Sequence, residues 1–523
     1  MKYLEIEHKI IDKFKKLNPI YKTSFFIAFG LINLAFLFHT INFMFGDHDW
    51  NYVRSANYWS EGSFEGRPLH FVLQSLFFNG HVLPILNNLL SFAAMTISGL
   101  LLARYWKIPA STFKYTIFTT FIAVLPLTMV WLFYAKDMLI NLSLPLIAIG
   151  GLYIAESQLS VKNLLRHILA IFLFYFAFAS YVAIINLLGV VFLGGILISY
   201  INGEKLLVLI KKKTPVVIDI LIALILFKIT LAHLTLSSDY NTATITMAGL
   251  PDKLKETLIV MLTQFTTPIP FMEYKYKLLL LGLCLFGCGA MFAKGKIEKA
   301  PFALIIILVI LFVSKSAFFI ADESDSILAK MENFAFVPRL DFYGLAYIYA
   351  LGLALTLSYT KKKWYKAGAI LAIVITFMSG VRDMYAEKVW KLGFDAEMKA
   401  HERIVGRLEQ MPDFHAGQKY RLLQIGTLSL RENFYKKVNG EETSLDLLTT
   451  AFTPQFMSRI VYNFYYPEDI FVDNVSVEAL SPRGKEYLRE AKVWPSLGSI
   501  FIDGDIIILV LTEEGLNKVK EKL

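Results

Sequence analysis

The sequence has few charged residues and almost no cysteine. Asp, Glu, Lys and Arg make up 18% of the 523 residues, whereas 56% are hydrophobic. Soluble domains are about a quarter charged, so this composition excludes an ordinary soluble protein and predicts an integral membrane protein. The two cysteines, Cys284 and Cys288, lie four residues apart in one apolar run. They share a helix face, and packing explains them better than a metal site or a disulfide.

Several signatures of other protein classes are also missing. No glycine-rich phosphate loop, zinc-ligand spacing or Ser-His-Asp arrangement stands out, and no repeats or low-complexity segments are evident. The first apolar run, 23–45, is not followed by a small-residue cleavage site, so we expect a retained span rather than a signal peptide. The net charge of +9 does not indicate a nucleic-acid partner, because the lysines cluster in short connections between apolar runs, as topology signals do.

The apolar runs predict eleven transmembrane helices, since a bilayer core of ~30 Å needs ~20 apolar residues per helix. They lie near 23–45, 82–103, 114–134, 138–155, 164–179, 182–201, 215–236, 277–293, 301–320, 341–359 and 365–383. The run from 164 to 200 is too long for one crossing, so we divide it at Ser180–Tyr181. Lys136–Asp137 is another very short connection, and 254–264 predicts a re-entrant or interfacial helix.

Positive charge is concentrated in alternate connections. These are 1–22, 104–114, 156–166, 203–213, 294–299 and 361–366, and the connections between them are acidic. The positive-inside rule then predicts a cytoplasmic N-terminal segment at 1–22. An odd number of spans in the membrane domain, 23–383, places the first large connection, 46–81, and the tail, 384–523, outside.

The tail differs in composition from the membrane domain. A charged helix over 387–410 continues outward from the last span, and strand-like runs follow at 420–426 and 505–511. Because about 130 residues suffice for one small domain, we predict an external α/β domain after an α-helical polytopic membrane domain.

The first external connection, 46–81, holds a dense group of polar and aromatic residues. Asp47 and Asp49 lie just beyond the first span, beside Trp50. A carboxylate there can act as a general base or bind substrate hydroxyls, and the alternative is a solvated helix cap. Because arginines, further acids and aromatic rings share the segment, we favour a site in which either aspartate is the active one. The Asp-x-Asp spacing leaves a divalent cation open as an alternative; otherwise we expect no cofactor.

Trp50, Arg54 and Arg67 in the same connection are candidate substrate-binding residues. Apolar and polar residues alternate at roughly helical spacing in 49–59 and 69–78, which predicts two short helices lying in the interface. Pro68 suits the start of the second helix.

Charged residues near or inside the other spans are further candidates. Asp137 costs ~2.5–3.5 kcal/mol if it enters the hydrocarbon, so it is either functional or neutralised by Lys136. Lys228 and Lys315 lie roughly 12 and 8 Å below the outer boundary, where they either snorkel outward or meet a lipid phosphate. Arg339 lies where the chain re-enters the membrane, and arginine suits bidentate phosphate contact.

These residues resemble those of the Gtr-type O-antigen glucosyltransferases, polytopic enzymes of the GT-C class. The strongest match is the acidic start of the first external connection followed by Gly66-Arg67-Pro68-Leu69. Weaker matches follow in chain order: Phe133-Tyr134-Ala135-Lys136-Asp137-Met138, Ser180-Tyr181, Phe336-Val337-Pro338-Arg339 and the end of the last helix near Arg407-Leu408. The family pattern has adjacent aspartates with an arginine three residues later. Here His48 separates the acids and Arg54 lies five residues after Asp49, so the equivalent aspartate and the sugar stay open.

The resemblance implies an inverting transfer of a hexose, with glucose as the family's sugar, from a polyprenyl-phosphate sugar to a surface glycan. The acceptor would be lipid-linked or lipopolysaccharide, and the reaction would occur at the periplasmic face of the bacterial inner membrane. The implied roles are Asp49 or Asp47 as the base, Asp137 orienting acceptor or sugar hydroxyls, Arg67 and Arg339 holding phosphate, and Lys228 and Lys315 as lesser phosphate candidates. An O-antigen polymerase and a lipid-linked glycan flippase or other transporter are the rival functions.

Overall fold

The structure is a computed structural model, and it divides into two compact units. It describes residues 18–42, 44, 67–78, 81, 83–132, 134–156, 163–234, 250–263, 265, 272, 274–294, 297–319, 342–361, 363–428, 459, 461–463 and 465–523. The first unit contains the described residues up to Tyr385, except 42, 44 and 134–136. The second unit contains these residues and the described residues from Ala386 onward.

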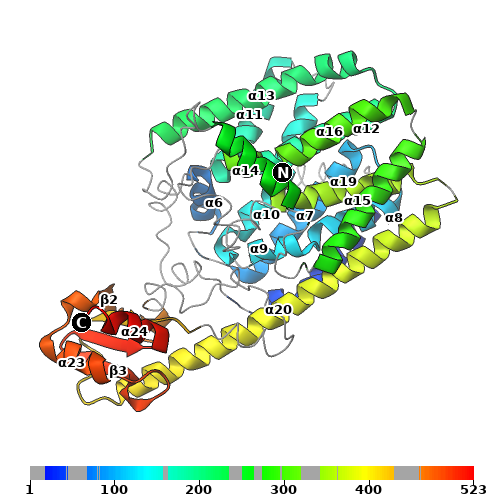
Figure 1. Ribbon diagram of the computed structural model, residues 1–523. Helices are drawn as coiled ribbons and strands as arrows, with labels where there is room; N and C mark the ends of the chain where they lie inside the picture. The colour runs from blue at the N-terminus through cyan, green and yellow to red at the C-terminus, as the bar shows by residue number, and fades with distance from the viewer. Residues whose placement is uncertain are drawn as a thin grey trace, which may run out of the picture. The chain divides into compact units, whose positions relative to one another are not determined.

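The first unit is helical (Figure 1). Its elements are α2 (Pro19–Ala35), α3 (Leu37–Ile41), α6 (Pro68–Phe78), α7 (Pro84–Tyr105), α8 (Thr112–Ala123), η2 (Pro126–Thr128), α9 (Met129–Leu132), α10 (Ala135–Glu156), α11 (Asn163–Ser180), α12 (Ile184–Ile201), α13 (Leu206–Ala232), α14 (Leu250–Thr263), α15 (Tyr274–Lys294), η4 (Ile297–Lys299), α16 (Ala300–Val313), η5 (Ser316–Phe319), α19 (Leu345–Tyr359) and the start of α20 (Tyr365–Glu409).

Within the described residues, seven helices are long and apolar enough to cross a membrane. The number is eight if α8 and η2–α9, bent by 45° at the break before Pro126, form one span. Three shorter apolar helices, α2, α16 and α19, occupy further predicted spans. A polytopic helical protein is therefore confirmed, whereas eleven crossings stay a prediction.

Local predictions in the membrane unit agree well with the observed elements. The division at Ser180–Tyr181 is confirmed, because α11 ends at Ser180 and α12 begins at Ile184. Pro68 begins α6, and α14, which ends at Thr263, overlaps the predicted helix at 254–264. The prediction of a connection at Lys136–Asp137 is wrong, because helix α10 begins at Ala135 and both residues lie in its first turn.

Small residues let neighbouring helices approach closely. A Cβ on Gly352 of α19 would lie 2.6 Å from the sulfur of Cys284 on α15, which agrees with a packing role for that cysteine. A Cβ on Gly151 of α10 would lie 2.7 Å from the ring of Phe174 on α11. Such pairs fix helices at short separations, as is typical of membrane bundles.

The connections that carry lysine clusters contact one another. The contacts are Lys107 Nζ to Glu204 Oε1 at 2.9 Å, Lys213 to Glu156, Lys299 Nζ to the carbonyl oxygen of Tyr200 at 2.7 Å, and the Tyr359 hydroxyl to Asn202 at 3.0 Å. The described parts of five predicted basic connections, 104–114, 156–166, 203–213, 294–299 and 361–366, thus lie at or next to one end of the bundle, whereas residues 1–17 lie outside the described residues. Which side this end faces stays a prediction.

The second unit contains the rest of α20, which Figure 1 shows as one continuous helix, and a four-stranded sheet. Its other elements are β1 (Tyr420–Ile425), β2 (Phe471–Asn474), η6 (Val477–Ala479), α23 (Pro482–Glu490), η7 (Leu497–Ser499), β3 (Ile500–Asp503), β4 (Ile506–Val510) and α24 (Glu513–Lys520). The strand order is β2-β1-β4-β3, in which β1 is parallel to β2 and β4, and β3 is antiparallel to β4.

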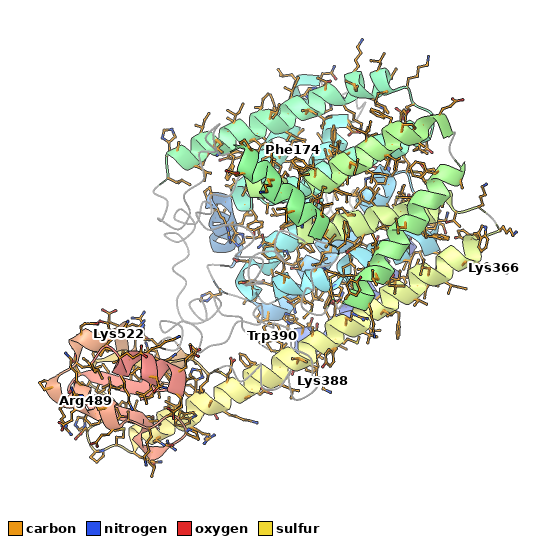
Figure 2. The ribbon with its side chains drawn as sticks, in the orientation of Figure 1. Phe174, Lys366, Lys388, Trp390, Arg489 and Lys522 are labelled. Atoms are coloured by element: carbon orange, nitrogen blue, oxygen red, sulfur yellow. The ribbon has the colours of Figure 1, made fainter. Side chains whose placement is uncertain are left out.

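Both faces of this sheet are covered by apolar side chains. Ile404 and Leu408 from the end of α20 contribute to the core on one face, and Leu488 of α23 and Leu516 of α24 contribute to the other. Charged side chains such as Arg489 and Lys522 are exposed (Figure 2). The observed fold of the tail is therefore a small mixed α/β unit, with strands at both predicted positions.

Candidate functional site

A buried carboxylate meets a guanidinium and an imidazole at one place in the membrane unit. Asp137 Oδ1 lies 2.8 Å from Nε2 of His70, and its Oδ2 lies 3.8 Å from Nη1 of Arg67. The exposed fraction is 4% for Asp137 and 0% for His70. A buried carboxylate is stable only when charge or hydrogen-bond partners compensate for its lost hydration. The three side chains therefore form one electrostatic unit.

The start of helix α6 sets two members of this unit on the same side. Arg67 directly precedes Pro68, whose fixed φ suits the first helical position, and the amide of His70 donates to the carbonyl of Arg67 at 3.2 Å. Residues three apart share a helix face, so both side chains reach Asp137. On the other element, Asp137 lies in the first turn of α10, where the helix dipole favours a negative charge.

Three aromatic side chains, Tyr181, Trp131 and Tyr343, form an aromatic wall beside Arg67. The guanidinium carbon of Arg67 lies 4.8 Å from the ring centroid of Tyr181, which follows α11. The Tyr181 ring packs edge-on against Trp131, with 5.3 Å between ring centroids, and at a tilt against Tyr343, with 5.8 Å between centroids. A cation over an aromatic face is attracted to it, so the wall restricts the positions that Arg67 can take.

The wall is held in turn by a feature of α10. Pro145 lies inside this helix and has no N–H to donate to the carbonyl of Asn141 four residues earlier. The hydroxyl of Tyr343 donates to that carbonyl oxygen at 2.9 Å. Membrane helices tolerate proline where a neighbour supplies the missing hydrogen bond. The sequence of α10 thereby fixes the ring of Tyr343.

The predicted site residues lie in different places in the structure, and some lie outside the described residues. The structure brings together Arg67 and Asp137, which are 70 positions apart in the sequence. Lys315 is fully buried, next to Ser316, whose hydroxyl donates to Asn186 of α12. Asp47, Asp49, Trp50, Arg54 and Arg339 lie outside the described residues.

Lys228 is not brought to this cluster. Its side chain is exposed on α13, beside Ile225 and Ile229, which are also exposed. An ammonium on an apolar, outward-facing surface fits a snorkelling anchor. Of the two interpretations of Lys228 from sequence, the structure favours the structural one.

Sequence reasoning missed His70, Trp131, Asn141 and Tyr343. His70 was not singled out from the sequence, although its spacing of three residues from Arg67 was available as a signal. The pairing of Asn141 with Pro145 was also readable, since proline four residues later leaves a carbonyl without its donor. The structure adds contacts of Asp137 with Arg67 and His70, and neutralisation of Asp137 by Lys136 stays a prediction.

Within the part of the chain that the structure describes, no group of three or more His, Cys, Asp or Glu side chains is placed to hold a metal ion. The Asp-x-Asp pair falls outside that part. Comparisons with protein-family models, curated proteins and solved structures found no match to this chain.

Proposed function

We propose that the protein is an inverting glycosyltransferase of the GT-C class. It moves a hexose, with glucose as the first candidate, from a polyprenyl-phosphate sugar to a surface glycan of the O-antigen or lipopolysaccharide type. The reaction takes place at the periplasmic face of a bacterial inner membrane, and the N-terminus is cytoplasmic. The observation that carries the proposal is the meeting of Arg67, Asp137 and Tyr181.

The three residues come from three of the segments on which the family resemblance rests. Arg67 belongs to Gly66-Arg67-Pro68-Leu69, Asp137 follows Tyr134-Ala135-Lys136, and Tyr181 belongs to Ser180-Tyr181. Their contacts, 3.8 Å between Arg67 and Asp137 and 4.8 Å between Arg67 and the Tyr181 ring, join segments that are far apart in sequence. Such convergence is what a shared site requires.

The chemistry needs little else from the protein. A carboxylate accepts the proton of the acceptor hydroxyl, the hydroxyl oxygen bonds to the anomeric carbon, and the bond from that carbon to the phosphate oxygen breaks. Polyprenyl phosphate leaves with the electron pair, so cations that hold its developing charge lower the barrier. Arg67 and Arg339 supply the cations, and Asp49 or Asp47 supplies the base.

Asp137 receives a different role from the one that the resemblance implies. Its carboxylate is 4% exposed and faces Arg67 and His70. In our proposal it therefore orients the phosphate-binding arginine instead of contacting sugar hydroxyls.

The test is donor consumption by the purified protein. With polyprenyl-phosphate hexose and an acceptor glycan, we expect release of polyprenyl phosphate and a glycan that is one hexose longer. A flippase would move the intact lipid across a vesicle bilayer without consuming it. An O-antigen polymerase would instead join lipid-linked repeat units and ignore the single-sugar donor. Either of these outcomes, without hexose transfer, contradicts the proposal.

A further inference from the structure

Two described side chains, His70 and Arg67, lie at different distances from the carboxylate of Asp137. The 2.8 Å separation from His70 is within hydrogen-bonding distance, whereas the 3.8 Å separation from Arg67 is longer than a hydrogen bond. Of these two side chains, His70 therefore lies closer to the carboxylate. Arg67 is attracted by its charge and is stacked on Tyr181.

This arrangement is built from packed elements. His70 is fully buried on α6, and α6 packs against α11, the helix that leads directly into Tyr181. Asp137 belongs to α10, which is fixed against α11 at Gly151 and Phe174. A change at His70 is therefore transmitted to Arg67 through Asp137 and not through a loosely held surface.

We propose that His70 is a positioning residue, which holds Asp137 so that Arg67 is oriented toward the phosphate of the lipid donor. The phosphate as ligand rests on the function proposed above, whereas the contact chain from His70 to Asp137 to Arg67 rests on the geometry. The shared chemistry is an anionic phosphate ester at the end of a long apolar chain. His70 itself does not touch the reacting atoms.

Two substitutions separate this role from simple packing. His70→Gln keeps an N–H donor that reaches the Asp137 carboxylate, whereas His70→Leu fills the space without a donor. In His70→Leu the carboxylate loses its close partner and turns toward Arg67 or takes up a proton, so the guanidinium leaves its position over Tyr181. Misplacement by about 1 Å costs up to ~100-fold in well-oriented sites.

The measurement is the affinity for polyprenyl phosphate in detergent, together with kcat and KM for donor transfer. We expect His70→Leu to weaken polyprenyl-phosphate binding and raise the donor KM by about 10- to 100-fold. His70→Gln should stay within about threefold of the wild type. The double variant His70→Leu/Asp137→Asn should bind no more weakly than the poorer single variant, because both residues act through one contact.

The chain supplies a matched control. His167 Nδ1 of α11 lies 2.7 Å from Asp219 Oδ2 of α13, which is the same kind of pair. It lies 14 positions before Tyr181, or about 20 Å along a helix. His167→Leu removes a histidine–aspartate contact in which the aspartate is buried and the histidine is partly exposed. It leaves the site unchanged, so it should alter thermal stability and leave polyprenyl-phosphate affinity at the wild-type value.

The proposal is overturned if His70→Gln binds as weakly as His70→Leu, or if His167→Leu weakens binding as much. It is also overturned if both His70 variants bind like the wild type. A failure of the proposed function looks different: the wild type binds polyprenyl phosphate, the His70 variants rank as expected, and no hexose is transferred. If inorganic phosphate competes for the site as well as polyprenyl phosphate does, the site binds a free anion. This result too contradicts a lipid donor.

Discussion

The hydroxyl of Tyr343 donates a hydrogen bond to the backbone carbonyl of Asn141 at 2.9 Å, and this is the carbonyl that Pro145 leaves without a helical donor. Tyr343 therefore supplies the hydrogen bond that α10 lacks, and its ring packs against Tyr181 and Trp131. The helix that carries Asp137 and the wall beside Arg67 are linked through this bond.

Tyr343→Phe should destabilise the protein by about 0.6 kcal/mol, the average for hydrogen bonds between membrane helices, and by no more than about 1.7 kcal/mol, the largest value for such bonds. Pro145→Ala restores the missing N–H to α10, so Tyr343→Phe should cost less in that background. Unfolding in mixed detergent micelles gives the free energies of all four members of the cycle. If the two substitutions are additive, the hydroxyl of Tyr343 does not replace the donor that Pro145 removes.

Gly352→Ala should destabilise the pairing of α15 with α19. The added methyl group would lie 2.6 Å from the sulfur of Cys284, and overpacking typically costs about 1–3 kcal/mol. Gly282→Ala on α15 is the control, because its methyl group would meet nothing within 4 Å. Thermal unfolding should show a loss for the first variant and no loss for the second; equal effects would contradict the close approach.

The second unit should weaken at acid pH through Asp505. The Arg421 side chain hydrogen-bonds to this carboxylate at 2.7 and 2.8 Å and holds its pKa below the ordinary 3.8. The unfolded chain therefore binds more protons near pH 3 to 4. The stability from the pair is fully present above the ordinary pKa and is lost as the pH falls through the lower, folded one.

Hydrogen exchange of the β1 and β4 amides in the full chain measures this effect. Arg421→Gln should speed exchange relative to the wild type at pH 6, and the ratio between the two proteins should approach one as the carboxylate is protonated. Comparing the proteins at each pH removes the intrinsic pH dependence of exchange. A ratio that does not change with pH would mean that the pair adds nothing to stability.

The predicted topology can be tested by labelling from one side of the membrane. Leu497 is 85% exposed on the second unit, so Leu497→Cys should react with a membrane-impermeant maleimide in cells with a permeable outer membrane. Lys107→Cys, at the lysine-rich end of the bundle, should react only after lysis. Both variants are made with Cys284 and Cys288 replaced by Ala. The reverse pattern would place the site on the cytoplasmic face.

Much of the fold was predictable because its signals are local. Apolar runs of membrane length determined where helices form, and each predicted run overlaps an observed helix. Strand β4 is apolar and mostly β-branched, and four of the six residues of β1 are hydrophobic, so both strands were found. Strands β2 and β3 are only four residues each, which is too short for a periodic signal, and β2 contains two polar residues in four.

The site was only partly predictable because its decisive relationships are not local. Arg67 and Asp137 were identified as charges near a membrane, but nothing in either segment states that α6 and α10 meet. Asp137 was assigned to a connection because Lys136-Asp137 interrupts two apolar runs, whereas the helix begins earlier, at Ala135. His70 becomes visible as a site residue only once its 2.8 Å contact with Asp137 is known.

The most direct test of the central claim is hexose transfer by purified Asp49→Asn and Asp47→Asn variants. Asparagine keeps the shape of aspartate and a hydrogen-bonding oxygen but cannot accept a proton, so loss of the base should lower kcat by about 10²–10⁴-fold. We predict that Asp49→Asn binds polyprenyl phosphate like the wild type and transfers almost no hexose, while Asp47→Asn is affected less. The reverse order would assign the base to Asp47. If both variants turn over like the wild type, neither carboxylate is the base, and glycosyl transfer at this site is contradicted.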